Sequence, residues 1–311
     1  MIFIIIVLIL AALPSWPVGR DLNNKLGRLI SPYGERVGIT FIDLATRGEL
    51  SINGSREFPA ASVAKVAVMA AAYHLADSSK LNLEQKVLFK ESDKLEGSGV
   101  LRWMRAGRLY TLRNLIRLMI ILSDNTATKM VIDTIGLPTI NHYIRGINLS
   151  ETIIGDPTML RELPSPTINL TSPADMAHLL ARIKSGKGFS KSSSAQMLSY
   201  MRKQRYRWGI WRGVPGGTAV ADKTGNLEGV LNDVGIVYTK HGNYVLSIFT
   251  RDFAKKSEAR KLINEISRVV YEEYTGEKVE QKTLTKRRLR HPPSGKSPPR
   301  LGRRGLVLNR K

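Results

Sequence analysis

The sequence contains no cysteine among its 311 residues. Disulfide bonds, thiolate metal sites, a cysteine nucleophile and a lipid-modified N-terminal cysteine are therefore excluded. Histidine is also scarce, and the five histidines include no His-Glu-x-x-His arrangement. This pattern argues against a metal-dependent hydrolase, and we expect neither a metal nor a cofactor.

The N-terminal segment lacks the positive charge that usually precedes the apolar part of a leader. Residues 1–13 are almost wholly apolar and are followed by a short segment with two prolines. Such a run is too brief for a comfortable membrane span and fits a signal peptide. Because no basic residue precedes it, an uncleaved anchor or a misplaced start codon stays open. We expect residues 1–20 to be a signal peptide or N-terminal anchor of a periplasmic or secreted protein.

The C-terminal segment lacks acidic residues. Residues 281–311 contain eleven Lys and Arg and no Asp or Glu, so half of the net charge of +22 lies there. With so little apolar content, we expect residues 277–311 to form a basic disordered tail. Such a tail is either simply solvated or adheres to an anionic envelope surface. It has no aromatic residue for base stacking, so we expect no nucleic-acid partner.

The remaining residues, 21–276, have the composition of a globular protein, since 42% of the whole chain is hydrophobic and 24% is charged. Strand patterns occur near both ends of this region, and the segment between about 81 and 211 is mainly helical. This order predicts an α/β (α+β) catalytic domain, in which an antiparallel sheet from distant segments is flanked by helices and carries an inserted helical lobe. We expect a monomer. The predicted strands are 36–43, 49–52, 218–222, 231–239 and 244–250, and the closing helix is 254–274.

One apolar run contains a charged residue that needs an explanation. Residues 63–74 are rich in alanine and valine, which predicts a helix buried on nearly every side, with Pro59 and Ser62 at its start. Lys65 inside this helix must be paired or pay a large desolvation cost. It lies three residues after Ser62, so the two share one face of the first turn. A desolvated amine beside a hydroxyl can activate a serine nucleophile without histidine, although Ser-x-x-Lys alone recurs by chance.

Two further tripeptides strengthen this interpretation. Ser-Asp-Asn at 123–125 falls between two predicted helices, where a loop can present side chains. Lys-Thr-Gly at 223–225 follows a predicted strand, and Gly225 permits a ligand to approach the backbone closely. Each tripeptide alone is compatible with a surface turn. Together with Ser62-x-x-Lys65, in this order, they indicate an active site.

With these motifs the chain resembles the class A serine β-lactamases and the wider group of penicillin-recognising serine enzymes. The resemblance covers residues 22–274 and implies a three-layer, transpeptidase-like fold. It implies that Ser62 attacks a lactam or peptide carbonyl to give an acyl-serine, and that Lys65 helps to remove the serine proton. Ser123 would relay a proton to the leaving nitrogen. The backbone N–H groups of Ser62 and Asn226 would form the oxyanion hole.

The same resemblance implies substrate-binding roles for the remaining motif residues. Asn125 would hold the amide side chain of the substrate. Lys223 would attract the substrate carboxylate and Thr224 would hydrogen-bond it. Gly225 and Asn226 would line the same strand edge, and Asp124 would brace its loop.

The chain departs from the family pattern in two places. The stretch 155–171 is short and lacks the usual spacing of a glutamate that positions the deacylating water. Glu162 is its only glutamate, and it is either the deacylation base or a loop carboxylate beside Arg161. No arginine follows Gly225 where many lactamases use one, so Arg207 and Arg212 are candidate substitutes.

These departures affect turnover more than acylation. We therefore expect a serine hydrolase of the class A β-lactamase type with slow deacylation. The alternative is a D-alanyl-D-alanine peptidase, that is, a penicillin-binding protein that acts on peptidoglycan. A third hypothesis is an idle domain that binds wall polymer, and the intact motifs argue against it. The expected partner is thus a β-lactam or a D-Ala-D-Ala-type substrate.

Overall fold

The computed structural model describes residues 18–159 and 168–279, with only the backbone for 18–20. Most of the predicted leader (residues 1–17), most of the predicted tail (280–311) and Glu162 lie outside these residues. Val18 already belongs to helix α1 (Val18–Ile30), and the backbone N–H of Val279 donates to Glu272 Oε1. Within them, no helix combines the length and apolar character needed to cross a membrane.

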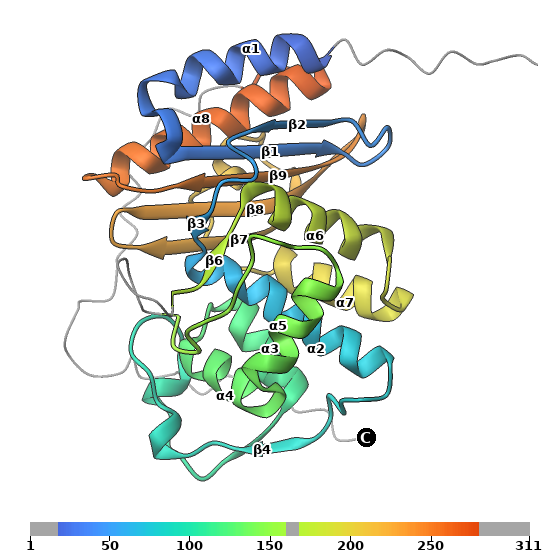
Figure 1. The fold of residues 1–311 in the computed structure, drawn as a ribbon, viewed down its shortest axis with the longest axis vertical. Coiled ribbons are helices and arrows are strands. Elements are labelled where there is room, and N and C mark those ends of the chain that lie inside the picture. The colour runs from blue at the N-terminus through green and yellow to red at the C-terminus, as the bar shows by residue number, and fades with distance from the viewer. Residues whose placement is uncertain (1–17, 160–167, 280–311) are drawn as a thin grey trace, which may run out of the picture. The chain divides into compact units, whose positions relative to one another are not determined.

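A five-stranded antiparallel sheet with the strand order β2-β1-β9-β8-β7 forms the centre of the domain (Figure 1). Strand β1 pairs with β9, so that Ile39 lies opposite Ile248. Segments from the two ends of the domain therefore share one sheet, which confirms the predicted architecture. The strands are β1 Val37–Asp43, β2 Glu49–Ile52, β7 Ala219–Leu227, β8 Val230–Thr239 and β9 Gly242–Thr250.

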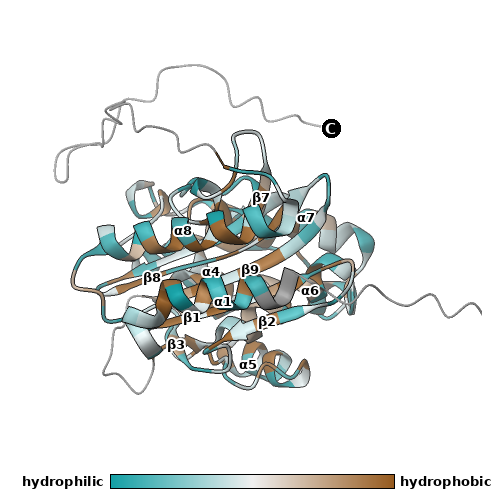
Figure 2. Cartoon of the chain, turned by 90° about the horizontal axis from the view of Figure 1, so that it is seen from above, coloured by the Kyte–Doolittle hydropathy of each residue, from teal (hydrophilic) through white to brown (hydrophobic). Residues whose placement is uncertain are grey.

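Helices cover both faces of this sheet. Helices α1 (Val18–Ile30) and α8 (Lys256–Thr275) lie side by side over one face (Figure 2). Leu22, Leu26 and Ile266 belong to the buried cluster on that face. Helix α6 (Pro173–Ser185) packs on the opposite face, beside the helical lobe. The resulting helix, sheet and helix layers exclude water from both sides of the strands.

The inserted lobe is largely helical, as expected, but it also contains a short hairpin. Strands β4 (Lys86–Leu88) and β5 (Leu109–Thr111) pair with each other at the end of the lobe farthest from α1. The prediction that residues 81–211 are mainly helical missed this hairpin, because each of its two strands is only three residues long. The other helices are α2 Lys65–Asp77, α3 Leu112–Ile121, α4 Asn125–Ile135, α5 Leu137–Gly146 and α7 Lys191–Arg202.

Helix α2 runs through the core, and its residues 65–73 are all buried. The predicted helix start is corrected in detail. Pro59 belongs to strand β3 (Phe58–Pro59), which pairs with β6 (Leu170–Thr171), and Ser62 lies in a 3-10 turn at Ala61–Ala64. Pro59 fits this place because a proline is tolerated in a short edge strand.

Candidate active site

Ser62 occupies a tight turn between β3 and α2. The preceding Ala61 has a φ of 47°, a left-handed conformation that is unusual for a residue with a side chain. Strand β7 runs directly against this turn: a Cβ at Gly225 would lie 3.0 Å from the Cβ of Ala61 and 3.1 Å from the carbonyl oxygen of Ala60. A residue without a side chain at position 225 therefore lets the Lys-Thr-Gly strand approach the turn that carries Ser62.

Lys65 is fully buried, at the first residue of α2. Its Nζ donates hydrogen bonds to the carbonyl oxygen of Ser123 (2.7 Å), to Ser123 Oγ (3.2 Å) and to Asn125 Oδ1 (2.7 Å). Burial lowers the pKa of Lys65 well below its usual value, the nearby Lys223 cation lowers it further, and Asp124 opposes both effects. A lowered pKa favours the neutral amine, which is the form of lysine that can accept a proton.

Ser123 lies between two amines. Its Oγ accepts hydrogen bonds from Lys65 Nζ at 3.2 Å and from Lys223 Nζ at 3.1 Å. Its backbone has a φ of 52°, which turns the chain sharply between α3 and α4. Because both hydroxyl lone pairs receive a proton donor, the hydroxyl proton of Ser123 remains free to be donated to a third group.

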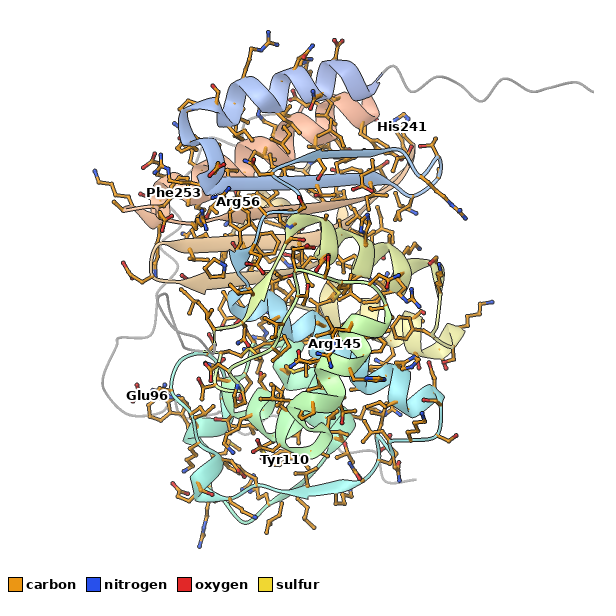
Figure 3. All side chains as sticks on the ribbon, viewed as in Figure 1. Arg56, Glu96, Tyr110, Arg145, His241 and Phe253 are labelled. Carbon is orange, nitrogen blue, oxygen red and sulfur yellow. The ribbon has the colours of Figure 1, made fainter. Side chains whose placement is uncertain are left out.

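Asp124 braces the loop that presents Ser123 and Asn125. Its carboxylate accepts hydrogen bonds from the backbone N–H of Ala127 at the start of α4, and from those of Val100 (2.6 Å) and Leu101 (2.9 Å) in a separate loop. Asn125 adds a second link, since its side chain donates to the carbonyl oxygen of Glu96, a residue labelled in Figure 3. These hydrogen bonds fix the 123–125 loop to the start of α4 and to the segment 96–101.

Replacing Asp124 by alanine is expected to lower the free energy of unfolding by about 3 kcal/mol, because three backbone donors, two of them in buried hydrogen bonds, lose their acceptor. Asp124→Asn, which retains one acceptor oxygen, should lose about half as much. Urea unfolding of the two variants and the parent measures both changes. Equal stability of Asp124→Ala and the parent would show that the brace contributes nothing.

Lys223 is fully buried in β7, so the Lys-Thr-Gly tripeptide lies inside the strand and not after it, as the sequence had suggested. Its Nζ donates to Ser123 Oγ and, at 2.8 Å, to the carbonyl oxygen of Thr224. Burial lowers the pKa of Lys223 to about 8, against the opposing charges of Asp222 and Asp233. Lys223 therefore keeps its positive charge at neutral pH.

Thr224 and Asn226 are positioned differently from Lys223. The Thr224 hydroxyl donates to Gln204 Oε1 at 3.0 Å, so it must rotate to donate to a ligand instead. Asn226 is exposed and lies opposite Leu231 of β8. Strand β7 is the outermost strand of the sheet, and its other edge faces the Ser62 turn.

A polar layer that the sequence analysis missed lies next to β7. Gln204 links Thr224 to Asp222, because its Nε2 donates to Asp222 Oδ2 at 2.7 Å. Asp233 Oδ2 accepts from the backbone N–H of Ile210 at 2.7 Å. Burial raises the pKa of Asp222 to about 7 and that of Asp233 well above its usual value. The sequence signal that could have revealed this layer is the presence of Asp222 and Asp233 in otherwise apolar strands.

The two arginines considered as carboxylate ligands are not in this cluster. The Arg207 guanidinium donates to the carbonyl oxygen of Arg202, and the Arg212 guanidinium donates to that of Arg207. Both guanidinium groups lie over the Trp211 ring, at 5.6 and 5.5 Å. Within the described residues neither guanidinium forms a hydrogen bond with Ser123 or Lys223, although the Arg207 charge opposes the rise that burial causes in the pKa of Asp222.

The loop that contains Glu162 is described at its two ends only. Its C-terminal end lies close to the nucleophile turn, since the backbone N–H of Ala60 donates to the carbonyl oxygen of Asn169 at 2.8 Å. The Asn169 side chain accepts from the backbone N–H groups of Gly155 and Asp156, which joins the two ends of the loop. Among the residues described, no group of three or more acidic or histidine side chains is arranged to hold a metal ion.

Comparisons with known proteins agree with this geometry. Residues 21–274 match the model of the Beta-lactamase enzyme family. The β-lactamase CTX-M-8 of Citrobacter amalonaticus is 26% identical over 274 residues, which cover 86% of this chain and 94% of that protein. The crystal structure of a β-lactamase from Sphaerobacter thermophilus is 30% identical, with a TM-score of 0.76, over 84% of this chain and 98% of that chain. A PBP-A mutant, solved as an acyl-enzyme complex with penicillin G, is 27% identical, with a TM-score of 0.77, over 83% of this chain and 97% of that chain.

The family match spans most of the chain and includes the nucleophile turn, the 123–125 loop and strand β7. These are the segments that the structure brings together around Lys65. The chain belongs to the β-lactamase enzyme family.

Proposed function

We propose that the protein is a serine hydrolase of the class A β-lactamase type, which opens the β-lactam amide through an acyl-serine intermediate. The observation that carries this proposal is the buried cluster of Lys65, Ser123 and Lys223, whose hydrogen bonds join three distant segments. Strand β7 approaches the Ser62 turn beside it. A serine nucleophile without a histidine can be activated by an amine of lowered pKa, and Lys65 in this cluster is such an amine.

In the proposed acylation, Ser62 Oγ forms a bond to the lactam carbonyl carbon while its proton passes to the neutral Lys65 amine. The backbone N–H groups of Ser62 and Asn226 stabilise the oxyanion. The carbon–nitrogen bond then breaks, and the leaving nitrogen receives a proton through the Ser123 hydroxyl. Water subsequently cleaves the ester, which releases the ring-opened acid and free Ser62.

Substrate binding is assigned to the residues around this path. The Lys223 cation attracts the substrate carboxylate, Thr224 donates to it after leaving Gln204, and Asn125 holds the amide side chain. Gly225 keeps the strand edge open for the substrate.

Substrate affinity should fall as the pH rises through about 8, because the Lys223 cation is present below its folded-state pKa and is lost above it. Between pH 7 and pH 9 the dissociation constant of a carboxylate-bearing penicillin should increase about tenfold. Titration calorimetry of penicillin binding to the acylation-deficient Ser62→Ala variant measures this change in the dissociation constant. A penicillin methyl ester, which has no carboxylate, serves as the control, and an equal fall for the ester would remove Lys223 from this role.

The alternative function is that of a D-alanyl-D-alanine peptidase, and a penicillin-binding protein would share the same acylation chemistry. The similarity to PBP-A, whose mutant was captured as a penicillin acyl-enzyme, favours keeping this alternative. The two functions differ in how long the acyl-serine lasts. Intact-mass spectrometry after mixing with penicillin G follows the adduct: its rapid loss with release of product supports the lactamase, and an adduct that lasts for hours supports the peptidase. Absence of any adduct would refute both and favour an idle wall-binding domain.

We propose Glu162 as the base that activates the deacylating water. Glu162→Gln should lengthen the lifetime of the penicillin adduct by about 100-fold or more, without slowing its formation. Asp156→Asn is the matched control, because Asp156 is the other acidic residue of this loop and its carboxylate accepts bonds from Thr158. An adduct that decays at the parental rate in Glu162→Gln, or a longer lifetime in Asp156→Asn alone, would remove Glu162 from the mechanism.

We propose functions other than catalysis for the two terminal segments. We infer that residues 1–20 direct export to the periplasm or medium, that residues 21–276 form a monomeric catalytic domain, and that residues 277–311 adhere to an anionic envelope surface. Deleting residues 281–311 should reduce salt-sensitive envelope binding and leave acylation unchanged. Loss of acylation in the deletion variant would contradict this boundary.

A further inference from the structure

Exposed apolar side chains are concentrated in one part of the described chain. Of the six large hydrophobic side chains that are exposed in the described residues, four lie between residues 88 and 109. Leu88 (46% exposed) and Leu109 (61% exposed) are direct cross-strand partners of β4 and β5, so they form one continuous apolar surface. Trp103, in the segment that connects these strands, is 68% exposed. We call Lys86, Leu88, Lys90 and Leu109 the hairpin face.

The hairpin face and its surroundings carry an excess of positive charge. Lys86, Lys90, Arg105 and Arg108 are exposed, and none forms an ion pair with a residue in the described part of the chain. Three nearby acidic residues are already paired, Glu84 with Arg113, Glu91 with Lys94 and Asp93 with Lys129. Glu96, the remaining acidic residue of the connecting segment, forms no ion pair within the described residues, and the excess of cations exceeds this one charge.

The alternation of the strand separates the two kinds of surface. Val87 and Phe89 point inward, toward the core of the lobe, and Phe89 packs edge-on against Tyr110. Lys86, Leu88 and Lys90 therefore point outward together. Tyr110 lies at the end of the lobe farthest from α1 (Figure 3), so the hairpin face is not covered by the sheet or by α8.

We propose that the hairpin face is a docking surface for an anionic lipid bilayer. Leucine side chains flanked by unpaired cations match the interface of a membrane, where apolar groups enter the acyl boundary and cations meet the headgroups. An exposed Trp103 next to Arg102, whose guanidinium lies 4.2 Å from the ring centroid, has the same amphipathic character. This surface is separate from the active site and does not depend on the proposed function.

Other occupants fit these residues less well. A second copy of the chain would bring two faces of like charge together. An anionic wall polymer would use the lysines and arginines but leave Leu88 and Leu109 in water, where their exposure has no benefit.

The absence of cysteine allows a direct test in the full-length chain. Leu109→Cys, labelled with the environment-sensitive fluorophore NBD, reports on the hairpin face, and Asn24→Cys on α1 is the matched control on the opposite side of the sheet. With vesicles of phosphatidylcholine and phosphatidylglycerol, the label at 109 should become brighter and blue-shifted, and the label at 24 should not. Vesicles of phosphatidylcholine alone should give a much smaller change.

Charge reversal separates this surface from the basic tail. Lys86→Glu with Lys90→Glu should weaken vesicle binding about tenfold or more, whereas Arg47→Glu with Lys187→Glu, at exposed positions elsewhere, should weaken it much less. Urea unfolding of each variant checks that it is folded. Binding with an unchanged signal at position 109 would assign binding to the tail and overturn the proposal. A signal that depends on protein concentration without vesicles would also overturn it, in favour of self-association.

Discussion

Ser62→Ala is expected to abolish the covalent penicillin adduct and to lower the rate of lactam opening by about 10⁴-fold or more. The reason is that Ser62 is the proposed nucleophile, so without it the remaining rate comes from binding and oxyanion stabilisation alone. Intact-mass spectrometry measures the adduct, and absorbance of the opened ring measures the rate.

The control for this variant is its stability. Within the described residues the Ser62 hydroxyl has no hydrogen-bond partner, and the side chain is partly exposed. Its removal should therefore change the free energy of unfolding by less than about 0.5 kcal/mol. A stable Ser62→Ala protein that still forms a stoichiometric adduct would mean that another residue is acylated, and the proposed mechanism would be wrong.

Several features of the site were predictable because they are local or because they break a pattern. The polar Lys65 in an alanine- and valine-rich run indicated a buried amine, and the structure gives it no exposure. The order of strand and helix patterns along the chain was enough to predict the antiparallel sheet and the helices that flank it. Glycine at 225 predicted the close approach of a ligand, whereas the close neighbour that the structure shows is the Ser62 turn.

Other features depend on pairing partners that lie far away in sequence. Strand β7 continues through the Lys-Thr-Gly tripeptide because β8 pairs with it from Ala219 to Leu227. Strand β3 exists only through its pairing with β6, more than 100 residues later. Single-sequence patterns contain no information about such partners, so tertiary pairing overrode the expected ends of these elements.

The Gln204 layer was hidden for the same reason. Gln204 follows α7, and nothing in its local sequence distinguishes it from a surface residue. In the folded chain it is buried and connects Asp222 with Thr224. Its importance follows from three segments that meet, and not from any one of them.

The two buried lysines have different electrostatic surroundings, and this difference assigns their roles. Burial lowers the pKa of Lys223 to about 8, and the nearby charges of Asp222 and Asp233 oppose this lowering. Lys65 has only Asp124 as a favourable charge, and Lys223 acts against it. We therefore expect Lys65 to be the neutral amine and Lys223 the cation. Environments that separate the pKa values of two like groups are a mark of acid and base assignments.

Lys65→Arg is accordingly expected to slow acylation by about 10³-fold or more at every pH, although it conserves the positive charge. The guanidinium of arginine does not lose its proton in this pH range, so it cannot accept the proton of Ser62. In the parent, acylation should increase as the pH rises through the lowered pKa of Lys65, because the neutral amine is the active form, and should fall again near pH 8 as Lys223 loses its charge. The rate of adduct formation between about pH 4 and pH 10 gives both limbs.

Lys65→Met separates the loss of the base from any loss of structure. Methionine has a similar volume and carries no charge. It leaves the carbonyl oxygen of Ser123 and Asn125 Oδ1 without their donor, which lowers stability. It also removes a fully desolvated amine, which offsets this loss. The variant should stay folded and acylate as slowly as Lys65→Arg. If Lys65→Arg instead acylated at the parental rate with the rising limb intact, the amine would serve only as a fixed charge, and the proton of Ser62 would have to leave by a route that avoids α2 altogether.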